Sequence, residues 1–192
     1  MLTFNFRQFD FKNKSGVMLD IGCGEGRHVF GTMQSYKNFY CIGLDMDEPS
    51  LAKAQEGFDF FKSISNEGAI FIKGSAYELP FPSDSIDLII CSEVLEHLNN
   101  YSEALSEIYR VLKPHGKFLA SVPSFFPEKI CWMLSKDYQN MPGGHVRIFK
   151  KKAIINEIEQ LGFLLKKQER FHSIHSPYWW LRCLFWKNQD NN

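Results

Sequence analysis

The sequence predicts a single α/β domain built on a mostly parallel β-sheet with helices on both faces. Short apolar runs alternate along the chain with longer amphipathic stretches, as in repeated strand–helix–strand units. The 192 residues suffice for one hydrophobic core, and 44% hydrophobic with 23% charged residues is ordinary for a globular protein. We therefore expect one domain over residues 1–192, with its core at about 17–170.

Strands are expected where short apolar runs occur. Residues 86–91 are nearly all apolar, which is typical of a strand covered on both faces. The five strands expected in the sheet comprise residues 17–21, 39–44, 69–73, 86–91 and 117–122. Residues 163–169 are expected to form one further strand.

Helices are expected where apolar residues recur every three or four positions. Residues 101–112 give the clearest pattern, and Lys113-Pro114-His115-Gly116 ends it, because Pro cannot continue a helix and Gly accepts the turn. Three other helices are expected: one directly after Gly26, one at residues 49–62 and one at residues 151–161.

Two aromatic segments do not fit the alternation. Residues 123–146 form a long stretch punctuated by Pro and Gly, and such inserts are usually functional lids or disordered. This stretch is too apolar for disorder, so we expect a substrate cap. Residues 174–187 form an aromatic tail, which we expect in the core or at a subunit interface.

Charge and cysteine usage exclude several classes of partner. Lys and Arg balance Asp and Glu at 22 each, whereas proteins that bind a phosphate backbone carry a positive excess, so we expect no nucleic-acid partner. The five cysteines lack zinc-ligand spacing, so we expect no metal and a reducing, cytoplasmic location.

No apolar run approaches the roughly 18–20 residues that span a bilayer, so we expect no integral membrane segment. The basic run at residues 150–152 leaves a peripheral contact with lipid open. We expect a monomer or homodimer.

The strongest motif is Asp20-Ile21-Gly22-Cys23-Gly24-Glu25-Gly26, in which an expected strand ends in three alternating glycines before a helix. Glycines accept backbone angles closed to other residues and let a ligand lie against the main chain. The G-x-G-x-G spacing is one residue shorter than the dinucleotide pattern G-x-G-x-x-G.

Three further groups follow other expected strands: Asp45, Gly74-Ser75-Ala76, and the run from Cys91 to His97. Asp45 stands close to where Rossmann folds place an acid on the ribose hydroxyls. Ligands bind at the carboxyl ends of strands in open α/β sheets. The sequence therefore predicts a Rossmann-like, doubly wound domain with a ligand site at this edge.

From about residue 17 to 166, the chain resembles the class I S-adenosylmethionine-dependent methyltransferases. The similarity is greatest to the small-molecule group that includes ubiquinone and menaquinone biosynthesis enzymes. Only sixteen residues precede Val17, so the family's upstream helix is expected to be short or missing, and no clean seventh strand is expected. The matching runs are residues 20–26, Asp45, 74–76, 79–81, 87–97, 112–116 (with His115 where the family has Gly), 144–149 and 161–163.

The resemblance implies S-adenosyl-L-methionine as cofactor, S-adenosyl-L-homocysteine as product and a small, partly hydrophobic molecule as acceptor. It implies main-chain approach at Gly22, Cys23, Gly24 and Gly26, with Asp20 facing the ammonium group, Asp45 the ribose hydroxyls and Met46 the adenine face. Ser75 and Ala76 would flank the adenine edge, and Ser92, Glu93 and Val94 would line the methionine arm.

A general base is optional in methyl transfer, because the cofactor supplies the reactivity. His97 and His145 are the candidates for that catalytic role, since a histidine titrates near neutral pH. Structural roles for both remain open. The alternates are Glu93, Tyr77, His172 and His175.

Two other functions remain open. One is an NAD-dependent oxidoreductase on the same fold, against which the shortened glycine spacing and the run from Glu93 to His97 count. The other is a cofactor-binding regulatory subunit without turnover.

Overall fold

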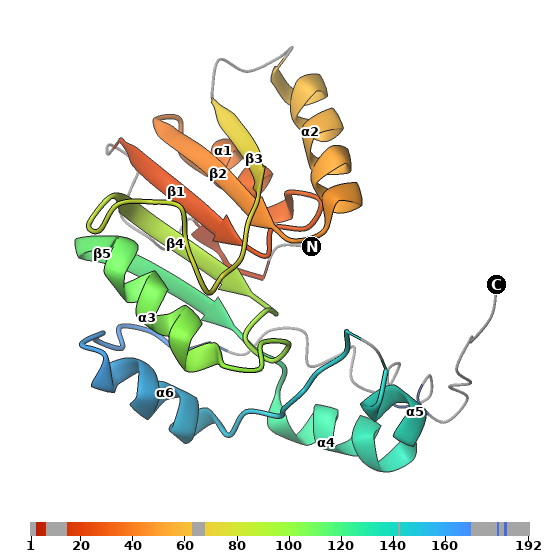
Figure 1. Ribbon diagram of the computed structural model, residues 1–192. Helices are drawn as coiled ribbons and strands as arrows, with labels where there is room; N and C mark the ends of the chain where they lie inside the picture. Colours follow the sequence, from red (N-terminus) through yellow and green to blue (C-terminus); the bar gives the residue numbers. More distant parts are fainter. Residues whose placement is uncertain are drawn as a thin grey trace. The chain divides into compact units, whose positions relative to one another are not determined.

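The computed structural model describes residues 3–6, 15–62, 68–141, 143–169, 180 and 183. Packing divides the chain into two compact units (Figure 1). The sheet unit comprises Met1–Val94 and Ser102–Ser121, and the helical unit comprises Leu95–Tyr101 and Val122–Asn192. That the whole chain acts as one methyltransferase domain stays a prediction.

Five parallel strands form the sheet, in the order β3-β2-β1-β4-β5. The strands are β1 (Gly16–Ile21), β2 (Phe39–Asp45), β3 (Ala69–Lys73), β4 (Ile86–Ser92) and β5 (Leu112–Ser121). The strand order changes direction between β1 and β4, and such a switch point is where open α/β sheets bind ligands. The predicted Rossmann-like α/β fold is thus confirmed.

Helices cover both faces of this sheet. The helices that pack on it are α1 (Arg27–Ser35), α2 (Glu48–Lys62) and α3 (Tyr101–Val111). In Figure 1, α3 lies in front of β4 and β5, whereas α1 lies behind β1 and β2. The buried residues of α3 form the predicted stripe: Ala104, Leu105, Ile108 and Val111.

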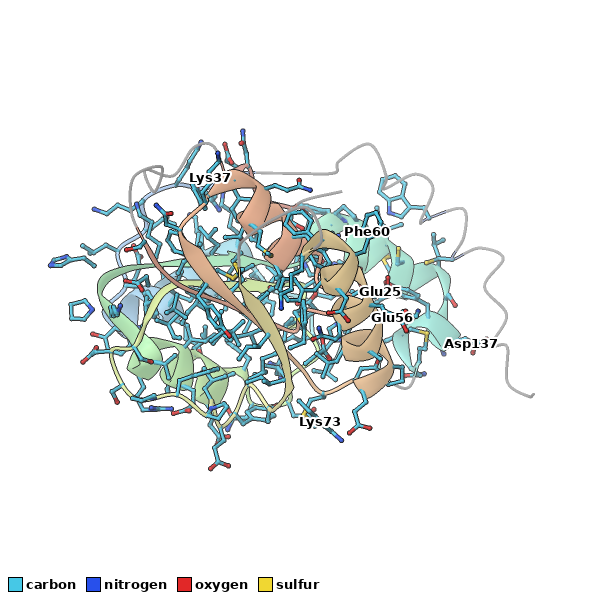
Figure 2. All side chains as sticks on the ribbon, turned by 90° about the horizontal axis from the view of Figure 1, so that it is seen from above. Glu25, Lys37, Glu56, Phe60, Lys73 and Asp137 are labelled. Atoms are coloured by element: carbon cyan, nitrogen blue, oxygen red, sulfur yellow. The ribbon has the colours of Figure 1, made fainter. Side chains whose placement is uncertain are left out.

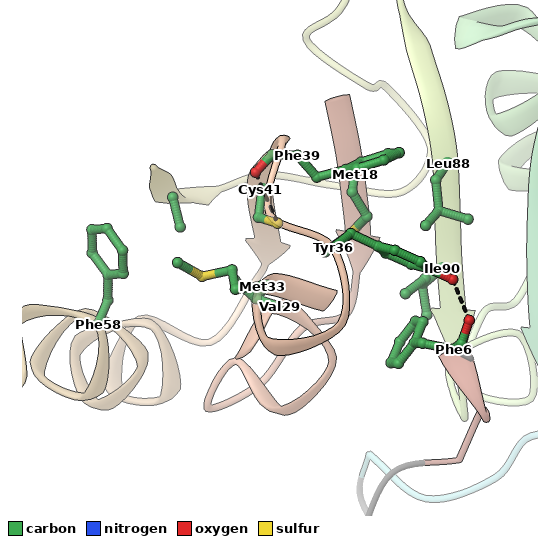
Figure 3. Close-up of a cluster of buried hydrophobic side chains, with 11 residues drawn as sticks. Phe6, Met18, Val29, Met33, Tyr36, Phe39, Cys41, Phe58, Leu88 and Ile90 are labelled. Carbon is green, nitrogen blue, oxygen red and sulfur yellow. Dashed lines mark hydrogen bonds between the residues drawn. The ribbon is translucent and has the colours of Figure 1, made fainter. Parts of the chain in front are cut away.

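One buried cluster joins the sheet to α1 (Figure 3). It brings Met18 of β1 and Leu88 of β4 together with Val29 of α1, and each is 0% exposed. Because side chains alternate along a strand, Leu19 and Ile89 point to the opposite face, and they are also 0% exposed. Burial on both faces explains why β1 and β4 are almost continuously apolar.

The helical unit contains α4 (Phe125–Leu134), α5 (Lys136–Gln139) and α6 (Lys151–Gln160). Two of these helices lie within residues 123–146, where the sequence indicated irregular structure, and the role of this segment as a cap stays a prediction. Pro127 is in the first turn of α4, where its missing N–H removes no helical hydrogen bond. Of the aromatic tail, 174–187, only Trp180 and Cys183 are among the described residues.

One expected boundary and one expected strand are wrong. β5 begins at Leu112 rather than at residue 117, because Leu112 pairs with Ile86 and Lys117 with Leu88, which leaves residues 113–116 as a bulge. Residues 163–169 form no strand. Leu164 is 76% exposed there, and an apolar run without a partner strand gains nothing from the extended form.

The surface carries ion pairs that join neighbouring elements. Lys53 forms an ion pair with Glu25, and Lys73 forms one with Glu48, each at 2.8 Å. All four side chains are more than half exposed, so these ion pairs add little to stability. Lys73 projects outward in Figure 2. Among the described residues, no helix combines the length and apolar character needed to cross a bilayer.

Candidate functional site

The loop between β1 and α1 has three glycines in the left-handed region: Gly22 at φ 68°, Gly24 at φ 52° and Gly26 at φ 82°. That conformation costs other residues about 1–2 kcal/mol. A Cβ on Gly22 would lie 2.3 Å from Cγ2 of Val94, whereas a Cβ on Gly24 would meet nothing within 4 Å. Gly22 therefore permits close packing of the loop, and Gly24 leaves main chain open to a ligand.

Asp45, at the end of β2, is bonded directly to this loop. Its Oδ2 accepts from the backbone N–H of Gly24 at 2.7 Å, and its Oδ1 accepts from that of Asp47 at 2.9 Å. Each carboxylate oxygen has a second lone pair, so the oriented group can still accept from two hydroxyls. Met46, the next residue, is 64% exposed.

Cys23 contributes main chain rather than a reactive thiol. Its side chain is buried, and its N–H donates to the carbonyl of Leu44 at 3.1 Å. Burial raises the pKa of the Cys23 thiol well above its usual range, with a further contribution from Asp20. The thiol stays protonated and is therefore a poor nucleophile.

Ser75 and Ala76 follow β3 next to Asp45. The backbone N–H of Gly74 donates to the carbonyl of Asp45 at 3.0 Å, and Ser75 Oγ accepts from the N–H of Tyr77 at 3.2 Å. Ala76 is buried. The turn is therefore held against the end of β2, and the placing of Ser75 and Ala76 at the adenine edge stays a prediction.

Two side chains of α3 fasten the chain that follows this turn. Glu107 Oε2 accepts from the N–H of Leu79 at 2.8 Å, and the Arg110 guanidinium donates to the carbonyls of Phe81 at 2.8 Å and Leu79 at 3.0 Å. Hydrogen bonds from Arg110 lower the pKa of Glu107, so the pair is ionised at neutral pH. The sequence did not indicate this anchor, because its partners are backbone atoms far along the chain.

Ser92, Glu93 and Val94 connect the end of β4 to β5 and to the glycine loop. Ser92 Oγ is buried and lies 2.9 Å from Ser121 Oγ. Glu93 has φ 57°, and its carboxylate accepts from Ser121 Oγ at 2.8 Å. A non-glycine residue held at positive φ is strained, and such strain is common at functional sites.

Asp20 is the most unusual residue of the sheet unit. Its carboxyl group is 0% exposed, and neither oxygen has a hydrogen-bond partner within the described ranges. Burial raises its pKa to about 8, opposed by Arg27 and reinforced by Asp45. His28 Nδ1 lies 3.8 Å away, but burial lowers the pKa of His28 to about 4, so that ring is neutral at pH 7. An ammonium group would satisfy this carboxyl group well.

The two candidate catalytic histidines meet within the helical unit. His97 and His145 stack edge to face with ring centroids 4.8 Å apart. His97 Nδ1 lies 2.9 Å from the carbonyl oxygen of Gly143, and His145 Nδ1 lies 2.6 Å from Oε1 of Glu128. A carboxylate that orients a histidine in this way is common in acid–base sites.

A pocket of about 500 Å³ is lined by both histidines together with Asn99, Trp132 and Met141. Glu128, which is 7% exposed, also accepts from Trp132 Nε1 at 3.1 Å. Pockets of this volume suit small organic molecules. The lining is mostly polar, with Trp132, Met141 and Val146 as its large apolar side chains.

The predicted residues thus fall into two groups. The cofactor candidates lie at the carboxyl ends of β1–β4 in the sheet unit, and His97 and His145 lie in the helical unit. Glu96 and Glu128 were missed, because a lone glutamate gives no sequence signal until its partners are known. Of the alternate bases, Tyr77 is 36% exposed and Glu93 is bonded to Ser121, while His172 and His175 lie outside the described residues.

Comparison with known families gives one match, to the family described as a methyltransferase domain, over residues 19–120. The match begins within β1, just before the glycine loop, and ends within β5. It therefore includes all the proposed cofactor-binding residues and His97, but not His145.

Three relatives illustrate the similarity. The uncharacterized methyltransferase YcgJ of Bacillus subtilis is 36% identical over 111 residues, which are 58% of this chain and 42% of YcgJ. Its crystal structure superposes with a TM-score of 0.67 and 26% identity, over 81% of this chain and 64% of that one.

A probable S-adenosylmethionine-dependent methyltransferase of Mycolicibacterium smegmatis is 30% identical over 147 residues, 76% of this chain and 51% of the relative. The sterol 24-C-methyltransferase of Pneumocystis carinii is 27% identical over 177 residues, 85% of this chain and 44% of that enzyme. The chain thus spans 42% to 51% of the length of these curated relatives.

Proposed function

Because this chain belongs to the family of class I methyltransferases, we propose that it transfers a methyl group from S-adenosylmethionine to a small, partly apolar acceptor. The observation that carries the proposal is the main chain at Gly24, which is left-handed, open on its Cβ side and hydrogen-bonded to Asp45. The buried Asp20 carboxyl group is a second, independent indication of a cationic ligand.

The bound cofactor supplies an electrophilic methyl group on its sulfonium. In this proposal S-adenosylmethionine lies against the main chain of the loop from Gly22 to Gly26. Asp45 accepts hydrogen bonds from the two ribose hydroxyls of the cofactor. Asp20 neutralises the ammonium group. Met46, Ser75 and Ala76 bound the adenine, while Ser92, Glu93 and Val94 line the methionine arm.

We propose His97 and His145 as the groups that accept a proton from the acceptor. The lone pair of each neutral ring resides on Nε2, because each Nδ1 faces an oxygen that only accepts. Trp132 and Met141 line the pocket and would contact the apolar part of such an acceptor, while the rest of the lining is mostly polar. The similarity to a sterol methyltransferase agrees with this acceptor class.

The predictions on nucleic acid, location, oligomeric state and subgroup still rest on the sequence. Balanced charge argues against nucleic acid as acceptor, and unpatterned cysteines favour the cytoplasm. The oligomeric state, monomer or homodimer, and the ubiquinone-like subgroup stay predictions. The comparisons give no support to the NAD-dependent oxidoreductase or the regulatory subunit.

The test is calorimetry with S-adenosylmethionine on wild type and Gly24→Ala. The added methyl group occupies the open side of the loop, so we expect affinity at least about tenfold weaker, equivalent to 1.4 kcal/mol. Gly162→Ala is the matched control, because Gly162 is also left-handed at φ 104° but lies after α6. It should bind as wild type does.

Equal binding by Gly24→Ala and wild type would contradict the proposal, as would tight binding of NAD in place of S-adenosylmethionine. Turnover is then measured as release of S-adenosylhomocysteine with a panel of sterol, quinol and phenol acceptors. Release with none of them would count against the acceptor class while leaving cofactor binding intact.

A further inference from the structure

We propose that Glu96, His97 and His145 form a binding site for a divalent transition-metal ion, for which zinc is the best chemical match. All three residues belong to the helical unit. Two of them, His97 and His145, are also the proposed proton acceptors, but zinc binding is tested without S-adenosylmethionine and so separately from methyl transfer. It also departs from the expectation of no metal, which considered only cysteine spacing.

The three side chains converge on one point. One ligand atom from each, a carboxylate oxygen and two ring nitrogens, lies within 4.8 Å of the other two. Ligand atoms of a tetrahedral zinc, with bonds of about 2.0–2.1 Å, are roughly 3.3 Å apart. The longest of these separations therefore needs to shorten by about 1.5 Å. Two histidines and one glutamate are a recurrent ligand set of catalytic zinc sites.

The tautomer of each ring suits metal binding. A carbonyl oxygen can only accept, so the 2.9 Å contact of His97 Nδ1 with Gly143 places a proton on Nδ1. The same argument applies to His145 Nδ1 and Glu128 Oε1 at 2.6 Å. In each neutral ring the lone pair then resides on Nε2, which is the nitrogen that can bind a metal. Carboxylate or carbonyl oxygens behind the ligating histidines are the usual outer partners of metal sites.

The backbone holds the two ligand segments together before any ion binds. The N–H of Val146 donates to the carbonyl of Glu96 at 2.9 Å, and Arg147 Nη2 donates to the carbonyl of Asn99 at 2.7 Å. The Arg147 guanidinium also lies 4.5 Å from the ring centroid of Tyr101. Ligands on segments fixed in this way lose little entropy when an ion binds.

The choice of ion follows from the ligands. Magnesium and calcium prefer oxygen ligands, whereas imidazole suits zinc, iron and other transition metals. Three protein ligands leave a fourth position of zinc for water or an oxygen of a small molecule. Both histidines line the pocket, so that position is accessible from it.

A bound ion would change the role of the histidines. One Nε2 lone pair cannot both coordinate a metal and accept a proton, so in the metal-bound protein His97 and His145 are ligands. An oxygen bound to the ion would lose its proton more readily, because a cation stabilises the anion.

The experiment is a zinc titration of the chelator-treated full chain, monitored by calorimetry at neutral pH without cofactor. We expect one zinc per chain in wild type and a loss of affinity of at least about 100-fold in His145→Ala and in Glu96→Gln. Glu128→Gln should lose about 10–100-fold, as outer-sphere changes do. His115→Asn is the matched control, because His115 is exposed on β5, and it should bind as wild type does.

No tight zinc site in wild type, or equal affinity in wild type and His145→Ala, would overturn the proposal. Should a variant fail to fold, nitrogen NMR of the wild-type imidazoles decides the question. Zinc should shift the Nε2 resonances of two histidines while their Nδ1 atoms stay protonated; shifts at Nδ1, or at histidines other than His97 and His145, would contradict it. Wild type that binds S-adenosylmethionine without binding zinc would refute this inference alone.

Discussion

At the scale of single residues, Asp20 joins stability to ligand binding. The folded chain holds this carboxyl group at a pKa of about 8, against an ordinary value of about 3.8. Between these two values the folded state binds more protons than the unfolded state. The stability contributed by the protonated group is therefore complete below about pH 4 and is lost as pH rises through 8.

We expect Asp20→Asn to flatten this pH dependence, since an amide does not titrate. The difference in free energy of unfolding between variant and wild type should move in favour of the variant from pH 5 to pH 8.5, by urea denaturation. His28 also titrates in part of this range, but it is present in both proteins and cancels in the difference. A difference that stays constant with pH would show that Asp20 is ionised in the folded chain.

The same substitution should weaken S-adenosylmethionine binding, because it removes the charge proposed to meet the ammonium group. In wild type at pH 7, binding should release a proton from Asp20. Calorimetry in buffers of different ionisation enthalpy measures that release directly, and Asp20→Asn should show none.

The functional residues that could be predicted from the sequence are those whose residue type is explained by their neighbours along the chain. The glycines and Asp45 belong to this kind, because strand ends, backbone freedom and spacing are all visible along the chain. The convergence of Glu96, His97 and His145 could not be predicted, because it depends on a backbone pairing between Glu96 and Val146.

At the scale of elements, α3 both covers the sheet and holds the loop after β3. Arg110→Lys keeps the charge but loses the planar fork that reaches Leu79 and Phe81. We expect a loss of about 1 kcal/mol in stability, reduced from the value for buried bonds because Arg110 is partly exposed. Limited proteolysis within residues 74–81 should also become faster.

Lys53→Arg is the control for that prediction, since it makes the opposite exchange in an exposed pair with Glu25. Its stability and cleavage pattern should match wild type. An Arg110→Lys protein as resistant as wild type would show that the loop is held by its own turn.

Strand positions were predictable to within a residue for β1 to β4, because each is a short run rich in apolar residues, and β1 and β4 are also buried on both faces. Bulges and pairing partners leave no such trace. The start of β5 depends on how Leu112 pairs with Ile86, and residues 163–169 have strand-like composition without forming a strand. α4 was missed because the Pro and Gly residues within 123–146 indicated irregular structure, although Pro127, in the first turn of α4, is tolerated.

At the scale of the whole molecule, a ligand that binds only the folded state stabilises it by mass action. S-adenosylmethionine at 100 times its Kd should add about 2.7 kcal/mol, which for a chain of this size raises Tm by about 5–10 °C. Differential scanning fluorimetry measures the shift, and NAD at the same concentration should give none.

Hydrogen exchange then locates the effect. Added protection should concentrate in residues 22–26 and 45–47 of the sheet unit with the cofactor, and in residues 96–97 and 143–147 of the helical unit with zinc. Protection by the cofactor that avoided the glycine loop would contradict the proposed site.

The contact between Gly22 and Val94 has a wider consequence for how this chain could be regulated. Val94 ends the first of the two segments that make up the sheet unit, and one buried residue, Leu95, separates it from Glu96. Val94, proposed to line the methionine arm, and Glu96, a proposed metal ligand, are therefore only two positions apart along the chain. Linkage is reciprocal. If S-adenosylmethionine changes the affinity of the chain for the ion by some factor, the ion must change the affinity for S-adenosylmethionine by the same factor.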